Sequence, residues 1–181
     1  MKSRVIIKSN KMARVYPMPD GKRGVFMEIR FANTGDIPQM IDLLQQVGEV
    51  HHQIRPDLFR AGAQKYDEAA LKKLLADPNR PIVAGVVDGK MVGYAFCILQ
   101  DVKNDPALCD RKSLYIDDLC VDASVRGGGV AKAIFDGVVD YAKSISCDAV
   151  TLNVWSGNDR ALHFYEKCGL RPQKMGMELP L

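Results

Sequence analysis

The sequence predicts a single α/β domain in which helices cover both faces of a mixed, mostly antiparallel sheet. Apolar residues recur with a period of two in several short segments and at helical spacing in others, and the two patterns alternate along the chain. Early in the chain, two apolar runs within 81–100 flank Asp88-Gly89, which is a strong hairpin signal. Later, strands and helices alternate. We therefore expect antiparallel pairing first and a strand-helix-strand arrangement after it.

The first half of the chain contains a strand and two helices before the hairpin. The segment FMEIRFA (26–32) predicts a short strand. Thr34 is expected to N-cap the helix that follows, because apolar residues recur after it at helical spacing: Ile37, Met40, Ile41, Leu44 and Val47. Pro56 breaks that pattern, and a second helix is predicted over 66–76.

The second half alternates between the two periods without a repeat or a linker. The expected elements are a strand at 112–122, a helix at 128–145, a strand at 149–155, a helix at 158–168 and a final strand from about 171. The strands of this half therefore complete one sheet, and its helices pack on that sheet.

The composition is that of a soluble globular protein. Its 181 residues are 47% hydrophobic and 26% charged. No apolar stretch approaches the roughly 18 residues that span a bilayer, so we expect no membrane partner. An odd number of cysteines without metal-type spacing indicates reduced thiols and a cytoplasmic location: Cys97, Cys109, Cys120, Cys147 and Cys168.

The first 26 residues are strongly basic, since their seven Lys and Arg face only one acidic residue, Asp20. Such an arm can contact nucleic acid or acidic lipid, but it lacks an interleaved aromatic pattern, and no nucleic-acid partner is expected. We interpret 1–26 as a poorly structured basic extension and 27–181 as the folded domain.

The segment VRGGGVAKAIF (125–135) places three glycines between a predicted strand and a helix. Backbone N–H groups at such a helix start bind phosphate. The dinucleotide fingerprint fails because Lys132 stands where its last glycine belongs. The P-loop fails as well, because Lys132 is followed by alanine rather than by Ser or Thr.

A third phosphate loop fits. Residues 126–131 read R-x-x-G-x-A after LCV (119–121), and this resembles the acetyl-CoA pyrophosphate loop of the GNAT acetyltransferases. NDRALHFYEKCGLRP (158–172) is similar to the later signature of that family, with Asn158 and Tyr165 seven residues apart. The resemblance covers 27–181 and implies acetyl-CoA as co-substrate, held by Leu119, Cys120, Val121, Arg126, Gly127, Gly128, Gly129, Val130, Ala131, Lys132, Asn158 and Tyr165.

The apolar alternation of the 112–122 strand changes parity across Asp117 and Asp118, because it runs through Leu114 and Ile116 and then through Leu119 and Val121. One extra residue, a β-bulge, has this effect. We expect the bulge to push the strand away from 149–155 and to open a slot for a thioester arm. The resemblance implies that the backbone of Leu119 and Val121 holds the pantetheine and that the Leu119 N–H stabilises the oxyanion.

Acetyl transfer to an amine needs a proton acceptor and a proton donor. Relatives that acetylate protein N-termini carry a glutamate where this chain has Asn153. YIDDLCV instead resembles the acidic strand of the diamine and polyamine acetyltransferases. By that resemblance Asp117 is the base, through water, and Asp118 anchors the amine. Tyr165 is expected to protonate the departing thiolate.

Glu49, His51 and His52 lie in the segment that matches the acceptor side of the family. The histidines can line the acceptor site with Glu49, or they can serve the helix as positive charges near its C-terminus. His163 and the cysteines are interpreted as packing residues, so no metal is expected.

The resulting prediction is an N-acetyltransferase that transfers acetyl from acetyl-CoA to a primary amine of a small molecule, by direct attack through a tetrahedral intermediate. The alternatives are a protein N-terminal or lysyl acetyltransferase and a non-catalytic acetyl-CoA-binding regulatory module. Resemblance to the family also favours a homodimer.

Overall fold

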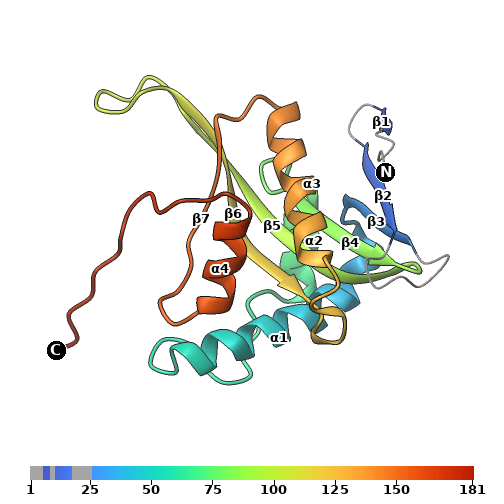
Figure 1. Cartoon of the computed structure of the whole chain (residues 1–181), viewed down its shortest axis with the longest axis horizontal. Coiled ribbons are helices and arrows are strands. Elements are labelled where there is room, and N and C mark those ends of the chain that lie inside the picture. The colour runs from blue at the N-terminus through green and yellow to red at the C-terminus, as the bar shows by residue number, and fades with distance from the viewer. Residues whose placement is uncertain (1–5, 9–10, 18–25) are drawn as a thin grey trace.

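The computed structural model describes residues 6–8, 11–17 and 26–181. In these parts of the chain, seven strands form one sheet in the order β1-β2-β3-β4-β5-β6-β7 (Figure 1). The strands are β1 (Ile6–Lys8), β2 (Lys11–Pro17), β3 (Phe26–Phe31), β4 (Ile82–Val87), β5 (Lys90–Val102), β6 (Arg111–Val121) and β7 (Ala149–Leu152). All neighbours are antiparallel except β6 and β7, which are parallel. The predicted mixed, mostly antiparallel sheet is confirmed.

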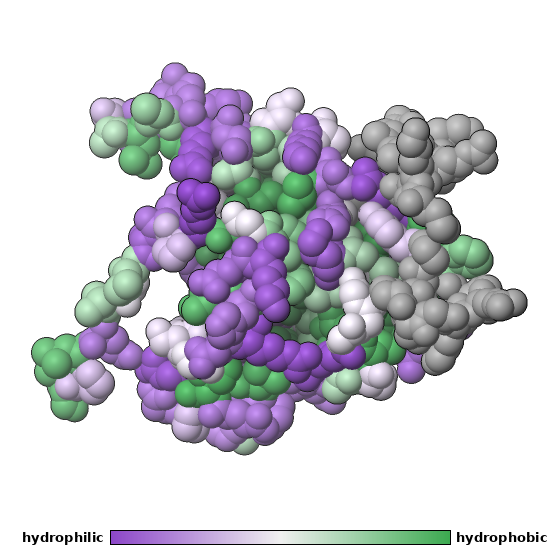
Figure 2. All heavy atoms as spheres, viewed as in Figure 1, coloured by the Kyte–Doolittle hydropathy of each residue, from purple (hydrophilic) through white to green (hydrophobic). Residues whose placement is uncertain are grey.

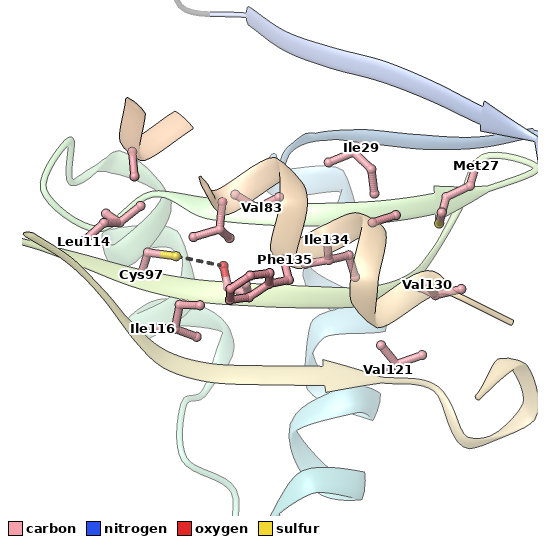
Figure 3. Packing of buried hydrophobic residues seen from close by; sticks show 14 residues of the cluster. Met27, Ile29, Val83, Cys97, Leu114, Ile116, Val121, Val130, Ile134 and Phe135 are labelled. Carbon is pink, nitrogen blue, oxygen red and sulfur yellow. Dashed lines mark hydrogen bonds between the residues drawn. The ribbon is translucent and has the colours of Figure 1, made fainter. Parts of the chain in front are cut away.

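Helices cover both faces of this sheet, as expected. They are α1 (Ile37–Ile54), α2 (Glu68–Ala76), α3 (Val130–Ser144) and α4 (Asp159–Lys167), with short 3-10 turns η1 (Thr34–Asp36) and η2 (Ala123–Val125). Figure 3 shows Ile134 and Phe135 of α3 packed on the sheet residues Val83 and Cys97. A second cluster joins α1 and α2 to the opposite face around Tyr94. The domain therefore has a helix-sheet-helix core.

Element boundaries agree closely with the sequence pattern. The hairpin turns at Asp88 and Gly89, whose φ angles of 49° and 77° are those of a tight hairpin turn. The prediction that Thr34 caps the helix at 37 was wrong, because Thr34 lies inside the 3-10 turn η1. Asn33 caps that turn in a reciprocal pair with Asp36, and Asp36 is the N-cap residue of α1.

The final strand predicted from about 171 is not formed. Residues 170–181 have no regular secondary structure, and Glu178 reaches Arg55 in an ion pair of 2.9 Å. The alternating apolar residues of this tail lie exposed, and Figure 2 shows apolar atoms at its far end, away from the body. Alternation predicts a strand only where a neighbouring strand is present, and none lies beside this tail in the described chain.

Of the predicted extension 1–26, residues 1–5, 9–10 and 18–25 lie outside the described residues, while 6–8 and 11–17 form β1 and β2 rather than a poorly structured arm. β2 pairs with β3 in antiparallel register, and Tyr16 packs against the α3 cluster. Arg14 forms an ion pair with Asp140 of α3. Local charge was misleading here because a distant helix supplies the opposite charge. The sheet therefore begins before Met27.

Close packing of α3 depends on Gly93 in β5. A Cβ at this position would lie 2.8 Å from the Cys120 carbonyl oxygen and 2.9 Å from Ile134 Cδ1. We predict that Gly93→Ala lowers the free energy of unfolding by about 1–3 kcal/mol, because the backbone oxygen has no room to move. Chemical denaturation measures this change. Gly176→Ala is the control, since nothing lies within 4 Å of its added Cβ. Equal stability of the two variants would contradict this packing.

Candidate active site

The site begins at a β-bulge in β6. In the pairing with β5, Phe96 faces Asp118 while Cys97 faces Ile116, so Asp117 is the extra residue. The parallel pairing with β7 ends at the same point, at Ile116 opposite Leu152. Beyond the bulge, β6 continues to Val121 without β7 beside it. The predicted bulge and the predicted separation from the 149–155 segment are both confirmed.

Asp118 is buried on the α1 side of the sheet. The Tyr94 hydroxyl donates a hydrogen bond of 3.0 Å to its carboxylate. Burial raises the pKa of Asp118 to about 6, although the positive charge of Lys65 and the Tyr94 hydrogen bond act in the opposite direction. Asp118 is therefore a carboxyl group that exchanges its proton close to neutral pH.

Asp117 lies on the same side and is more exposed, with 24% of its side chain accessible. Lys65 Nζ donates to its carboxylate at 2.9 Å, and the Tyr66 hydroxyl lies 3.5 Å away. Asp117 is thus already paired with a cation. The two neighbouring aspartates differ sharply in their surroundings, because Lys65 neutralises the first and burial acts on the second.

Tyr165 comes from α4 and packs beside the α3 cluster. Its ring contacts Phe135 and Phe164, with centroids 6.3 and 5.1 Å away. Burial raises the pKa of Tyr165 well above its usual value, and the charge of Asp118 raises it further. The hydroxyl therefore keeps its proton at neutral pH and can act as a donor.

The glycine loop leads directly into α3. Gly127 and Gly129 have φ angles of 85° and 73°, in the left-handed region that favours glycine. Gly129 is the N-cap of α3, so the first N–H groups of that helix have no acceptor within it. Arg126 Nε donates to the Val121 carbonyl at 3.0 Å and ties the loop to the end of β6. This geometry offers backbone donors to an anion.

The side chains around the loop have mixed surroundings. Val130 is buried in the core, and Ala131 also packs against that cluster. Lys132 pairs with Asp136 one turn further along α3. Cys120 lies on the opposite face, where burial raises its pKa to about 12. Asn158 caps α4 by accepting a hydrogen bond from the Ala161 N–H at 3.2 Å.

The structure separates the three predicted acceptor residues of α1. His51 faces the loop between α1 and α2, and its ring centroid lies 5.0 Å from that of Phe59. Burial lowers the pKa of His51, and the nearby Lys65 lowers it further. His52 Nδ1 donates to the Phe59 carbonyl at 2.7 Å, which fastens the loop. His51 therefore lies close enough to Lys65 to feel its charge, whereas His52 fixes the backbone of the loop at Phe59.

Glu49 lies elsewhere, in a groove of about 480 Å³ beside Gln46 and Arg126. Its carboxylate accepts a hydrogen bond from Gln53 at 3.0 Å. Residues 49 and 51 are separated by about 200° around a helix, so they point to different sides of α1.

Three residues of the site were missed in the sequence. Lys65 and Tyr66 lie in or just after an irregular loop, where no periodic pattern places them. Tyr94 stands within an apolar run and has the appearance of an ordinary core residue. Only the folded structure brings them to the acidic pair.

The cysteines, the possible metal ligands and the apolar character of the helices point to no further site in the described residues. All five cysteines have free thiols. No cluster of three or more His, Cys, Asp or Glu side chains suited to a metal ion is found in residues 6–8, 11–17 and 26–181. Among the helices described there, none is long and apolar enough to cross a membrane.

Comparison with known proteins gives a consistent result. Residues 47–170 match the model of the acetyltransferase (GNAT) family. The glucosamine 6-phosphate N-acetyltransferase of Trypanosoma brucei brucei is 36% identical over 157 residues, which cover 87% of this chain and 97% of that protein. The crystal structure of a mutant of the BH1408 protein from Bacillus halodurans has a TM-score of 0.81 and 35% identity, and the match covers 84% of this chain and 98% of that one.

More distant relatives are named after other molecules. The thialysine N-epsilon-acetyltransferase of Bos taurus is 22% identical over 152 residues, covering 80% of this chain and 84% of that protein. The mycothiol acetyltransferase of Propionibacterium freudenreichii is 30% identical over 93 residues, which are 51% of this chain and only 28% of that longer protein.

The buried carboxyl group predicts a pH-dependent stability. Because the folded state holds the Asp118 proton up to about pH 6, above the ordinary range, the contribution of Asp118 to stability is greatest below about pH 4 and is lost as pH rises to about 6. Asp118→Asn stays neutral. We predict that its free energy of unfolding, relative to wild type, increases by about 3 kcal/mol over that window.

Urea denaturation at several pH values measures this difference. The exposed Asp42 on α1 provides the control Asp42→Asn, which should follow the wild type. A constant difference between Asp118→Asn and wild type across the window would show that Asp118 titrates normally.

Proposed function

The chain belongs to the acetyltransferase (GNAT) family and is an N-acetyltransferase, and on that premise we propose that it acetylates the primary amine of a small molecule. GNAT enzymes take the acetyl group from acetyl-CoA. The observation that carries the proposal is the acidic pair, Asp117 and Asp118, at the point where β6 leaves β7. A carboxylate can bind the ammonium group of the acceptor. A buried carboxylate whose pKa lies near neutral pH can also take the proton of that ammonium group.

The glycine loop is suited to the pyrophosphate of acetyl-CoA. Its glycines leave the backbone uncovered, and the first turn of α3 directs N–H groups outward. The β6 backbone beyond the bulge has no β7 partner, so the N–H groups of Leu119 and Val121 can serve the pantetheine arm and the thioester oxygen. Loop and strand together position the acetyl group beside the acidic pair.

The surroundings favour exchanging the roles that the sequence suggested for the two aspartates. Asp118 is the buried group with a pKa of about 6, so it is ionised above that pH and can accept the proton of the attacking amine. Asp117 already holds the ammonium of Lys65, which is the contact expected of an amine anchor. Tyr165 supplies the proton for the thiolate, since its raised pKa keeps the hydroxyl protonated.

A small acceptor is favoured over a protein for two reasons. Asn153, at the position where N-terminal acetyltransferases carry a glutamate, donates to the Tyr115 hydroxyl at 3.2 Å and offers no base. The relative named as a glucosamine 6-phosphate N-acetyltransferase matches this chain over nearly its whole length. A panel of amines with acetyl-CoA, followed by thiol release, tests the proposal directly. Turnover on peptide amines alone would contradict it.

A homodimer in the cytosol completes the proposal. Free thiols fit a reducing compartment. The tail has the alternation of a strand, and its exposed apolar residues can pair with β7 of a second copy: Met175, Met177, Leu179 and Leu181. Deletion of 173–181 should convert the dimer to a monomer, as measured by light scattering. The same mass with and without the tail would contradict this arrangement.

The two aspartates should separate in a pH–rate profile. We predict that wild-type kcat/KM falls below about pH 6 as Asp118 takes up its proton. In Asp118→Asn, this limb disappears and activity at neutral pH drops by about 100-fold. Asp117→Asn should keep the limb and chiefly raise KM for the amine. A wild-type profile in a folded Asp118→Asn variant would remove Asp118 as the base.

Tyr165 should act on chemistry rather than on binding. Tyr165→Phe keeps the ring in its contacts and removes only the hydroxyl. We expect kcat to fall by about 100-fold while the affinity for CoA changes little. Initial-rate assays measure kcat, and calorimetry measures the affinity for CoA. Weakened CoA binding with an unchanged kcat would assign the hydroxyl to cofactor binding instead.

A further inference from the structure

We infer that Lys65 is an acetyl acceptor of this enzyme, modified in cis at the acceptor site by the chain that carries it. The inference rests on the proposed function, because it places a side chain of the protein where that function places the substrate amine. It adds a modification site on the loop between α1 and α2.

The Lys65 ammonium has the surroundings expected of a bound acceptor amine. Its Nζ lies 2.9 Å from the Asp117 carboxylate and 5.4 Å from the centroid of the Tyr66 ring. The negative charge of Asp118 acts on it as well. A carboxylate partner, an aromatic face and a second carboxylate therefore surround a primary amine at the bulge.

Other lysine ion pairs in the described chain are local. Lys72 pairs with Glu68 and Lys132 with Asp136, in each case four residues apart on one helix. The Lys65–Asp117 pair joins residues 52 positions apart, from an irregular loop to β6. Lys65 is thus the lysine that the fold brings to the acidic pair, although 44% of its side chain is still accessible.

The position is also close to the proposed acetyl site. Leu119, whose N–H is assigned to the thioester oxygen, lies two residues beyond Asp117 on β6. Along a strand that distance is about 7 Å. The lysine side chain has a flexible four-carbon stem, so its amine can cover such a distance by rotating away from Asp117.

The chemistry balances with groups already assigned. Asp118 takes a proton from the Lys65 ammonium, and the neutral nitrogen attacks the thioester carbonyl carbon. A C–N bond forms and the C–S bond breaks, while Tyr165 protonates the sulfur and the second proton of the attacking nitrogen restores the tyrosine hydroxyl. The products are an amide on Lys65 and free CoA, with one proton released overall. No oxidant, metal or further reactant is required.

Burial opposes the charge of Lys65, but its hydrogen bond and ion pair with Asp117, helped by Asp118, outweigh burial and raise the Lys65 pKa. A firmly held ammonium reacts slowly, so we expect a single, slow turnover that accelerates as pH rises. Once acetylated, Lys65 loses its charge and releases Asp117. The modification therefore converts an internally occupied site into one that is open to other amines.

The experiment incubates the purified full-length chain with acetyl-CoA that carries a deuterated acetyl group, without added amine. Peptide mass spectrometry then follows each lysine. We expect Lys65 to be labelled at least about tenfold faster than Lys72, which is also ion-paired and exposed but pairs with Glu68 on its own helix rather than with the acidic pair. The fractional rate should not depend on protein concentration, because the reaction is intramolecular.

Two variants sharpen the test. Tyr165→Phe should slow Lys65 labelling by the same factor as turnover on a small amine. Lys65→Arg keeps a cation beside Asp117 and should abolish the label at this position alone. Equal labelling of Lys65 and Lys72, or the same labelling in heat-denatured protein, would overturn the inference as nonspecific chemistry. A rate proportional to protein concentration would overturn the intramolecular claim.

A parallel assay of thiol release with small amines separates this inference from the proposed function. Turnover on a small amine with no label on Lys65 overturns the inference and leaves the function standing. Absence of both overturns the two together.

Discussion

One extra residue in β6 is the constraint on which the site depends. Asp117 has no partner on β5, and at that position the parallel pairing between β6 and β7 stops. A regular strand would have continued the ladder and filled its own backbone donors with β7. The bulge instead leaves the end of β6 uncovered and turns two consecutive carboxylates toward α1 and α2. The bulge therefore sets where the glycine loop, Tyr165 and the acceptor side lie relative to one another.

Placing charge at the break is costly, and the neighbouring residues offset that cost. Asp118 would be expensive to ionise in its buried position, and Tyr94 and Lys65 reduce the penalty without removing it. Because part of the penalty remains, the carboxyl group of Asp118 titrates near neutral pH, and a proton acceptor needs this property. Structure and chemistry are therefore linked through one desolvated group, since the same burial lowers stability above about pH 6 and makes the group a base.

Much of this could be predicted from the sequence because the signals are local. A change of parity within one strand shows the bulge, and three glycines before a helix show the anion site. Lys65 and Tyr94 could not be predicted as site residues, because each joins the acidic pair through contacts across more than twenty positions. The predicted last strand failed for a related reason, since strand formation depends on a neighbour that local alternation does not reveal.

Deletion of Asp117 tests the central role of the bulge most directly. Removing this one residue keeps the pairing of Phe96 with Asp118 and of Cys97 with Ile116, so a regular ladder can form on both sides. Calorimetry with CoA is the measurement, together with circular dichroism to show that the chain is folded. The account predicts a folded protein that no longer binds CoA, because β6 and β7 can pair beyond Ile116. A folded deletion variant that binds CoA as tightly as wild type would contradict it.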